Sequence, residues 1–167
     1  MRTLYLLRHA KSSWDDPALA DHERPLAPRG RRAAKRIAEH MRRSGIEPEL
    51  VLCSTAVRAR QTLELARASI PGSSVALEAA LYGASADELL ARVRRLPDAV
   101  GSVMLVGHNP GLQDLALLLA AGDSEVARVE AKFPTGALAT LTLRTTWSGL
   151  APAEATLAGY AVPRDLQ

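Results

Sequence analysis

Three short apolar runs, separated by much longer segments with helical periodicity, constrain the fold of this chain most. The runs are Thr3–Leu7, Leu50–Cys53 and Val103–Val106. Each run is long enough for a buried strand and too short for a helix that crosses a core. Strands that alternate with helices are typical of an α/β fold with a mostly parallel central sheet. We therefore expect a three-layer domain in which helices flank that sheet.

The segments between the apolar runs carry signals for helices and for weaker strands. Pro28 stands at an expected first helical turn and Gly45 just after an expected last turn, as is usual at helix ends. Ser85 and Glu88 have the spacing of a capping box at the start of a later helix. These patterns predict helices over 28–44, 56–69, 86–96 and 112–121, and further strands over 75–77, 137–143 and 155–160.

The length of the chain indicates a single domain. With 167 residues, the chain has the size of one ordinary domain and can bury a hydrophobic core. A hydrophobic fraction of 47% and a charged fraction of 23% are those of a folded globular protein rather than of a disordered one. The sequence contains no internal repeat, low-complexity tract or linker, so we expect one domain over residues 1–167.

The charge and the cysteine content of the chain limit its possible binding partners and its cellular compartment. Arginines crowd the segment 29–36, but the net charge of the chain is only +3. We interpret this segment as the solvated face of a helix, with a patch that binds a polyanion as the alternative, and expect no nucleic-acid partner. A single cysteine, Cys53, excludes an internal disulfide framework and a multi-cysteine zinc site. The N-terminal apolar run is too short for a signal peptide, and no run reaches the roughly 18 residues of a membrane helix. We therefore expect a cytoplasmic protein without membrane contact.

Two of the four histidines follow predicted strands at the same offset. His9 comes two residues after the run Thr3–Leu7, and His108 two residues after the run Val103–Val106. In an open parallel sheet, ligands bind outside the carboxyl ends of the strands. We therefore expect both imidazoles at the site where such a fold binds its ligand.

Arginines accompany the histidines at these strand ends. Arg8 directly precedes His9, and Arg58 lies in the first turn of the helix that Ser54 or Thr55 can cap. A guanidinium group matches phosphate oxygens with two hydrogen bonds, and a helix N-terminus also favours an anion. The sequence has no His-x-x-x-His or His-Glu-x-x-His spacing for zinc. The arrangement predicts a phosphate pocket and no metal site.

Three motifs in register resemble those of a known family. Leu7–Ala10 resembles the Arg-His-Gly/Ala motif of the histidine phosphatase superfamily, which has the phosphoglycerate-mutase-like fold, with Ala10 in the place of the more frequent glycine. Ser54–Thr62 resembles the second motif of this superfamily, and Val106–Pro110 the third. The short chain and the segment Asp21–Gly30 are similar to the small phosphohistidine phosphatases of the SixA type.

The resemblance implies a mechanism and a set of site residues. His9 would attack phosphorus and carry the phosphoryl group until water hydrolyses the phosphoenzyme. Cationic side chains around the phosphoryl group would stabilise its charge without a metal or cofactor. The resemblance assigns this clamp to Arg8, Arg58 and His108. It also places Arg24, Ser54 and Asp21 at the substrate-binding rim, with a loop-to-helix salt bridge as the alternative role of Arg24 and Asp21. Lys11 and Trp14 are interpreted as loop residues outside the site.

The proton donor is where this sequence departs from larger members of the superfamily. Those members carry a glutamate just ahead of a Tyr-Gly pair. Here Ala79 falls in that register before Tyr82 and Gly83, and Glu78 lies one residue off. Glu78 is therefore either a displaced proton donor or a surface carboxylate. A phosphoramidate substrate tolerates the absence of a strong acid, because its imidazole leaving group needs less help. This favours phosphohistidine over an alkyl phosphate.

Other functions remain open at this point. Cys53 and Arg58 resemble the Cys-(x)5-Arg loop of cysteine-based phosphatases, but one intervening residue is missing and glycines are absent. The metabolic mutases of the superfamily carry a lid insertion, for which the segment 71–90 leaves no room, so we expect a shallow, open pocket. Such a pocket suits phosphohistidine on a partner protein, such as a phosphotransfer domain in signal transduction. A small phosphorylated metabolite as substrate, or a non-catalytic phosphate-binding or phosphoprotein-binding module, is the alternative.

Overall fold

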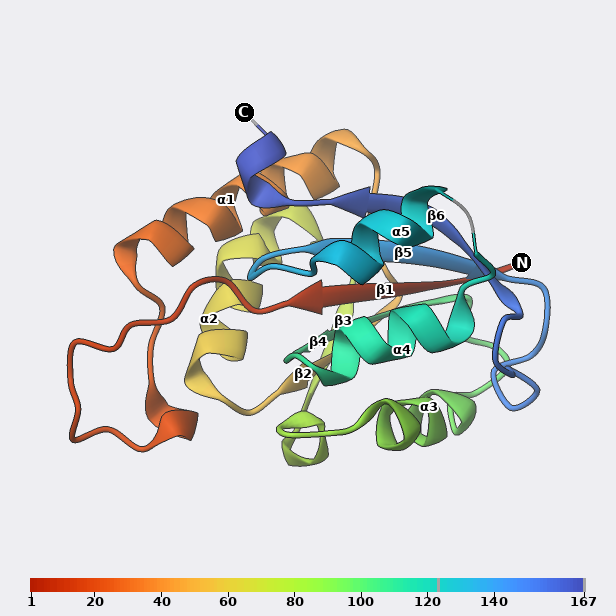
Figure 1. Cartoon of the computed structure of the whole chain (residues 1–167), viewed down its shortest axis with the longest axis horizontal. Helices are drawn as coiled ribbons and strands as arrows, with labels where there is room; N and C mark the ends of the chain where they lie inside the picture. The colour runs from red at the N-terminus through yellow and green to blue at the C-terminus, as the bar shows by residue number, and fades with distance from the viewer. Residues whose placement is uncertain (123, 167) are drawn as a thin grey trace.

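A six-stranded sheet forms the centre of the computed structural model, which describes residues 1–122 and 124–166 (Figure 1). The strand order is β3-β2-β4-β1-β5-β6. Four neighbouring strands, β3, β2, β4 and β1, run parallel, whereas β5 is antiparallel to β1 and β6 is antiparallel to β5. The prediction of a mostly parallel sheet is confirmed. The strands are β1 (Arg2–Arg8), β2 (Leu50–Ser54), β3 (Ser74–Glu78), β4 (Ser102–Gly107), β5 (Leu138–Leu143) and β6 (Ala155–Ala161).

Helices cover both faces of the sheet, as the three-layer prediction requires (Figure 1). Each predicted helix is present, with ends that differ from the prediction by a few residues. A fifth helix, α5, was not predicted, because only Val129 of its eight residues is buried and its apolar pattern is correspondingly short. The helices are α1 (Pro28–Arg43), α2 (Val57–Ala66), α3 (Ala86–Arg94), α4 (Gly111–Leu119) and α5 (Ser124–Ala131), with 3-10 turns at Asp21–Glu23 (η1), Arg67–Ser69 (η2), Ala79–Leu81 (η3) and Pro163–Asp165 (η4).

The central strands are buried on both sides. In β1, Leu4 and Leu6 pack into the core under α3 and α4, whereas Leu7 packs into the core under α1 and α2. All three side chains are inaccessible to solvent. Because neither face meets water, the strand reads as a continuous apolar run rather than as an alternating one. This explains why the three apolar runs were clear in the sequence.

The edge strand β3 has a weaker sequence signal because one of its sides is open. Leu77 is 53% exposed and Val75 is 37% exposed. After β3, only the turn η3 separates the sheet from α3, which begins with the predicted capping box of Ser85 and Glu88. The expectation that no lid is inserted here is met. Among the described residues, no helix has both the length and the apolar character needed to cross a membrane.

Candidate active site

A hollow of about 260 Å³, which we call the phosphate hollow, lies at the carboxyl ends of β1 and β4 and beside the first turn of α2. Arg8, His9, Arg58 and His108 all line it, together with Arg24. The parallel pairing of β1 and β4 aligns Arg8 with Gly107, so the next residue of each strand is a histidine. The ring centroids of these two histidines are 5.1 Å apart. The four residues that the motifs singled out therefore meet at one point.

His9 has one ring nitrogen fixed by the backbone and the other directed at an arginine. Its Nδ1 donates to the carbonyl oxygen of Ala10 at 2.7 Å, which leaves the lone pair on Nε2. The Nε atom of Arg58 lies 3.4 Å from this Nε2. Burial, reinforced by the charges of His108, Arg58 and Arg8, lowers the pKa of His9 from 6.5 to about 3. His9 is thus a neutral imidazole at neutral pH, and its unprotonated Nε2 accepts a hydrogen bond from Arg58.

Ser54, the last residue of β2, holds His108 in place. Its Oγ is 2.8 Å from Nε2 of His108 and also accepts a hydrogen bond from the N–H of Ala56. Ser54 is fully buried, so the predicted contact with substrate is replaced by a contact with this imidazole. Ala56, and neither Ser54 nor Thr55, stands at the N-cap of α2. Burial, followed by the charge of Arg58, lowers the pKa of His108 to about 4.

Asp21, in the turn η1, fixes two arginines of the phosphate hollow. Arg58 donates to the Asp21 carbonyl oxygen at 2.6 Å and to its carboxylate at 2.9 Å, and Arg24 donates to the other carboxylate oxygen at 2.9 Å. The hydroxyl of Tyr82 also donates to this carboxylate. These hydrogen bonds, that of Tyr82 foremost, hold the pKa of Asp21 far below its ordinary value. The loop-to-helix salt bridge predicted as the alternative is therefore present for Asp21, through Arg58 of α2, whereas Arg24 pairs with Asp21 within the loop.

Arg8 is anchored by one nitrogen and leaves another unpaired. Its Nη1 donates to the carbonyl oxygen of Phe133 at 2.9 Å. Within residues 1–122 and 124–166, its Nε is buried without a hydrogen-bond partner, and the same holds for Nδ1 of His108. Because buried polar groups are nearly always paired, two unpaired atoms in this region are unusual.

The segment after His9 is held by contacts from two helices. The N–H of Ala10 donates to Oγ1 of Thr62 in α2 at 3.0 Å. On the other side, α1 lies so close that a Cβ on Gly30 would be 2.0 Å from the carbonyl oxygen of Lys11. Only glycine permits this approach. The nucleophile candidate therefore stands on a backbone that two helices position.

Comparison with known proteins agrees with this geometry. A family model of the histidine phosphatase superfamily (branch 1) matches residues 4–85. A solved structure assigned as the phosphohistidine phosphatase SixA of Nakamurella multipartitia superposes with a TM-score of 0.86 at 33% identity, and the match covers 97% of this chain and 96% of that one. The chain belongs to the histidine phosphatase superfamily.

Two further comparisons extend over the whole chain. The structure of the protein histidine phosphatase SixA complexed with tungstate superposes with a TM-score of 0.81 at 26% identity, covering 99% of both chains. The Mycobacterium tuberculosis protein Rv1276c is 41% identical over 162 residues, which are 95% of this chain and 100% of that protein. The resemblance to the SixA-type branch of the superfamily is thereby confirmed, and these neighbours support a phosphatase activity.

The phosphate hollow of this histidine phosphatase includes two residues that the sequence analysis placed outside the site. Lys11 and Trp14 both line it, contrary to the interpretation that they lie outside the site. Trp14 is 72% exposed, and the guanidinium carbon of buried Arg24 lies 3.2 Å from the centroid of its ring. Their position just after the Arg8-His9 motif was the available signal, but an irregular loop has no periodicity that shows which way its side chains point.

Glu78 lies outside the phosphate hollow. Its two carboxylate oxygens each accept a hydrogen bond from Arg92 of α3, both at 2.8 Å. These hydrogen bonds lower the pKa of Glu78, so its carboxyl group holds no proton to donate at neutral pH. The role of a proton donor is therefore not supported by the structure. The position fits the other interpretation, that of a carboxylate in a salt bridge at the surface.

Cys53 does not have the environment of a nucleophile. It is fully buried in β2, and burial raises the pKa of its thiol to about 12. Because the thiolate is the reactive form, such a cysteine is inert. Among the residues that the structure describes, no group of three or more His, Cys, Asp or Glu side chains is arranged to hold a metal ion. The absence of a metal from the reaction stays a prediction.

Proposed function

We propose that this protein is a phosphohistidine phosphatase that transfers the phosphoryl group to His9 and then to water. The observation that carries the proposal is the phosphate hollow, where a neutral imidazole with an unprotonated Nε2 lies among Arg8, Arg58 and His108. Two guanidinium groups and an imidazole supply the charge and the donors that a transferring phosphoryl group needs. No metal is required in this scheme.

The reaction has two displacements at phosphorus. In the first, the Nε2 lone pair of His9 forms a P–N bond while the P–N bond to the substrate imidazole breaks. The leaving nitrogen keeps the electron pair and takes a proton from solvent. In the second, the oxygen of a water molecule bonds to phosphorus, the bond to Nε2 breaks, and the water proton leaves to solvent. The arginines stay in place through both steps because Asp21 and the Phe133 carbonyl hold them.

The protonation states of the candidate acids support a phosphoramidate substrate. Within the described parts of the chain, the two predicted acidic residues, Asp21 and Glu78, are both held ionised by hydrogen bonds. An alkoxide leaving group would need a strong acid, whereas an imidazole leaves readily once it takes a proton. The tungstate bound to the SixA neighbour, a tetrahedral oxyanion like phosphate, agrees with an oxyanion site in this fold.

The open approach to the hollow supports a protein as the carrier of the phosphohistidine. No insertion covers the hollow between β3 and α3, so a residue on the surface of a partner protein can reach His9. A phosphotransfer protein in the cytoplasm is the proposed partner, and no nucleic acid or membrane takes part. Hydrolysis of a small phosphorylated metabolite, or phosphate binding without turnover, is the alternative.

Rapid quench in alkaline detergent after incubation with a labelled phosphoramidate tests the proposal, because alkali preserves a phosphohistidine that acid would hydrolyse. The wild type should yield an alkali-stable, acid-labile phosphoenzyme, and His9→Ala should yield none. Loss of the nucleophile should lower turnover by at least about a thousand-fold, as such losses do in enzymes with covalent intermediates. Far-ultraviolet circular dichroism of the variant checks that it is folded.

Two results would contradict the proposal. Phosphate binding without a phosphoenzyme or phosphate release would favour a binding module. Faster turnover of phosphate monoesters than of a phosphohistidine protein would favour a metabolite phosphatase.

A further inference from the structure

A second hollow, which we call the cationic hollow, lies next to the phosphate hollow and has a volume of about 260 Å³. It lies where α1 approaches the C-terminal turn η4 (Figure 1). Its charged lining consists of cations alone, and its other lining is mainly apolar. The cations are Lys11, Arg29, Arg36 and Arg164, and the apolar residues are Ala33, Pro134, Val162 and Pro163.

The charge of the cationic hollow is not compensated by carboxylates of the described chain. Lys11, Arg29 and Arg36 form no ion pair with any described Asp or Glu. Only Arg164 has such a neighbour, Asp165, at 3.9 Å. Like charges that face one hollow repel each other and attract a polyanionic partner.

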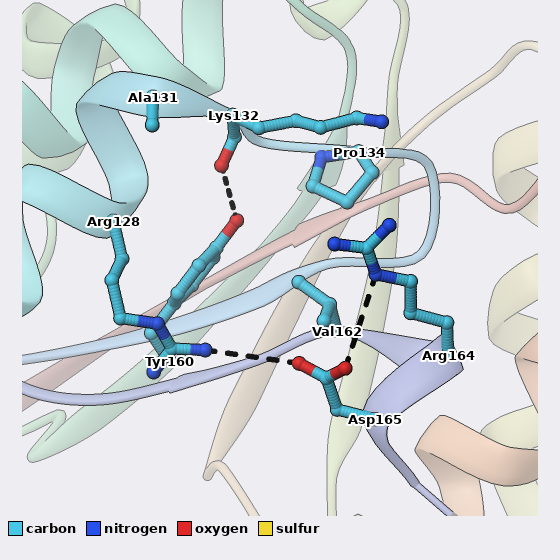
Figure 2. Close-up of a pocket in the computed structure, with 8 residues that line it drawn as sticks. All are labelled: Arg128, Ala131, Lys132, Pro134, Tyr160, Val162, Arg164 and Asp165. Atoms are coloured by element: carbon cyan, nitrogen blue, oxygen red, sulfur yellow. Dashed lines mark hydrogen bonds and ion pairs between the residues drawn. The ribbon is translucent and has the colours of Figure 1, made fainter.

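A third hollow nearby contains arginines that are paired with a carboxylate. Figure 2 shows the Asp165 carboxylate between the guanidinium groups of Arg128 and Arg164, with Tyr160 beneath Arg128. Arg128 also pairs with Glu125 at 3.0 Å. Carboxylates thus offset the charge of Arg128 beside the third hollow, whereas Lys11, Arg29 and Arg36 of the cationic hollow form no ion pair with a described carboxylate.

The cationic hollow continues directly from the phosphate hollow. Lys11 and Thr135 line both of them. The close contact of Gly30 with the Lys11 backbone fixes α1, and with it Arg29 and Arg36, beside the segment that follows His9. An extended ligand with its phosphoryl group at His9 can therefore pass Lys11 and lie across the second hollow.

We propose that the cationic hollow binds an acidic segment of the phosphorylated protein, next to the phosphohistidine that enters the active site. Charge complementarity selects the acidic residues of that segment. The apolar floor accepts an aliphatic side chain among them. A single phosphate or a small metabolite fills the phosphate hollow without reaching Arg29 and Arg36. This inference rests on the proposed function, since it assigns the substrate of that same site.

Two synthetic peptides test the inference. Both carry one phosphohistidine, flanked by Asp, Glu and Leu in one peptide and by Asn, Gln and Leu in the other. The wild type should hydrolyse the acidic peptide with a kcat/KM about ten-fold higher than that of the neutral peptide, since two or three exposed charge pairs contribute roughly that factor. The preference should shrink as added salt screens the charges.

A matched pair of charge-reversal variants locates the effect. Arg29 and Arg36 lie two turns apart on one flank of α1, whereas Arg31 and Lys35 lie one turn apart on the other flank, outside the hollow. All four side chains are exposed. R29E/R36E should lose the preference for the acidic peptide and keep its rate on the neutral one. R31E/K35E changes the net charge equally and should keep the preference.

The outcomes separate this inference from the proposed function. If the wild type hydrolyses neither peptide, the proposed function fails. If it hydrolyses both at equal rates, the proposed function stands and the acidic-segment inference is overturned. Equal loss in the two double variants would overturn the assignment to this hollow, because net charge alone would then explain the effect. Inhibition by single-stranded RNA without a peptide preference would assign the hollow to nucleic acid and also overturn it.

Discussion

Asp21 and Asp165 each lie between two arginines, but their surroundings differ. Asp21 accepts hydrogen bonds from Arg58 and Arg24, both at 2.9 Å. The side chains of these arginines are only 8% and 7% exposed. In partly buried surroundings such charge-assisted hydrogen bonds are short and directional, and they fix the positions of both guanidinium groups.

The carboxylate of Asp165 is 3.9 Å from Arg128 and 3.9 Å from Arg164, whose side chains are 48% and 80% exposed. Solvent screens such pairs, and they contribute little to stability. Positive charge alone therefore does not make a phosphate site. The arginines must be held in one geometry before the ligand arrives, because only then is no reorganisation needed during the reaction.

Among the variants that compare these two carboxylates and their arginines, removal of an arginine beside Asp21 should cause the greatest loss. Arg58→Ala should lower kcat/KM on a phosphohistidine substrate by about a hundred-fold or more, because a fixed donor to the phosphoryl group is lost. Arg128→Ala, the matched variant at the exposed place, should stay within about two-fold of wild type. Steady-state kinetics measures both. Equal losses would mean that the two arginine pairs do not differ in function.

Replacement of the two carboxylates by amides should give the next largest difference in kcat/KM. Asp21→Asn keeps the shape of the side chain but removes the charge that holds Arg58 and Arg24, so kcat/KM should fall about ten-fold. Asp165→Asn should leave it unchanged. A thermal unfolding curve for each variant shows whether the fold is intact. A normal rate in Asp21→Asn would show that the Asp21 carbonyl, which Arg58 also contacts, holds the guanidinium alone.

The burial of His9 beside Arg58 also predicts that the free energy of unfolding depends on pH. Folding lowers the pKa of His9 from 6.5 to about 3, so between these values only the unfolded chain binds the proton. The free energy of unfolding therefore falls as pH decreases through this window, by on the order of 1 kcal/mol per pH unit from this residue. His9→Asn removes this contribution. Urea unfolding of both proteins at several pH values measures it, and parallel curves would contradict the assigned burial of the imidazole.

The smallest loss of kcat/KM is expected from substitution of Trp14, an exposed residue that lines the phosphate hollow. The stacking of Arg24 on exposed Trp14 contributes a modest cation–π interaction, so Trp14→Ala should lower kcat/KM by roughly two- to five-fold. Trp14→Phe keeps an aromatic face and should recover most of the activity. A variant that loses as much as Arg58→Ala would instead place Trp14 among the residues that contact the phosphoryl group.

The features that could be predicted best from the sequence are the buried strands and the residues that directly follow them. Strands buried on both faces read as apolar runs, and the carboxyl ends of parallel strands meet at one edge of a sheet. These two facts are sufficient to predict that His9, Arg58 and His108 lie together. The histidine phosphatase resemblance added the order of the motifs, and the family and fold that it implied are confirmed. The catalytic roles of these residues stay predictions.

The parts that could not be predicted depend on contacts between distant segments. The sequence left open whether Asp21 lies at the substrate-binding rim or in a salt bridge, and its position between two arginines arises only when η1 packs on α2. Whether Glu78 faced the site or α3 depended on where Arg92 came to lie. The helix α5 buries too little of its surface to leave a clear apolar stripe. In each case the deciding energy comes from tertiary packing rather than from local propensity.

Gly30 sets a fixed distance within the molecule. Because its missing side chain lets α1 rest against the carbonyl of Lys11, the gap between His9 and the arginines of α1 is determined by backbone contact. A methyl group there would push the helix outward and lengthen that gap. If the cationic hollow binds the acidic segment, the position of α1 fixes the distance between the site of the phosphoryl group and the site of the acidic residues. Substrates are then sorted by how many residues separate their phosphohistidine from their acidic cluster, and the Gly30→Ala substitution would favour a longer spacing.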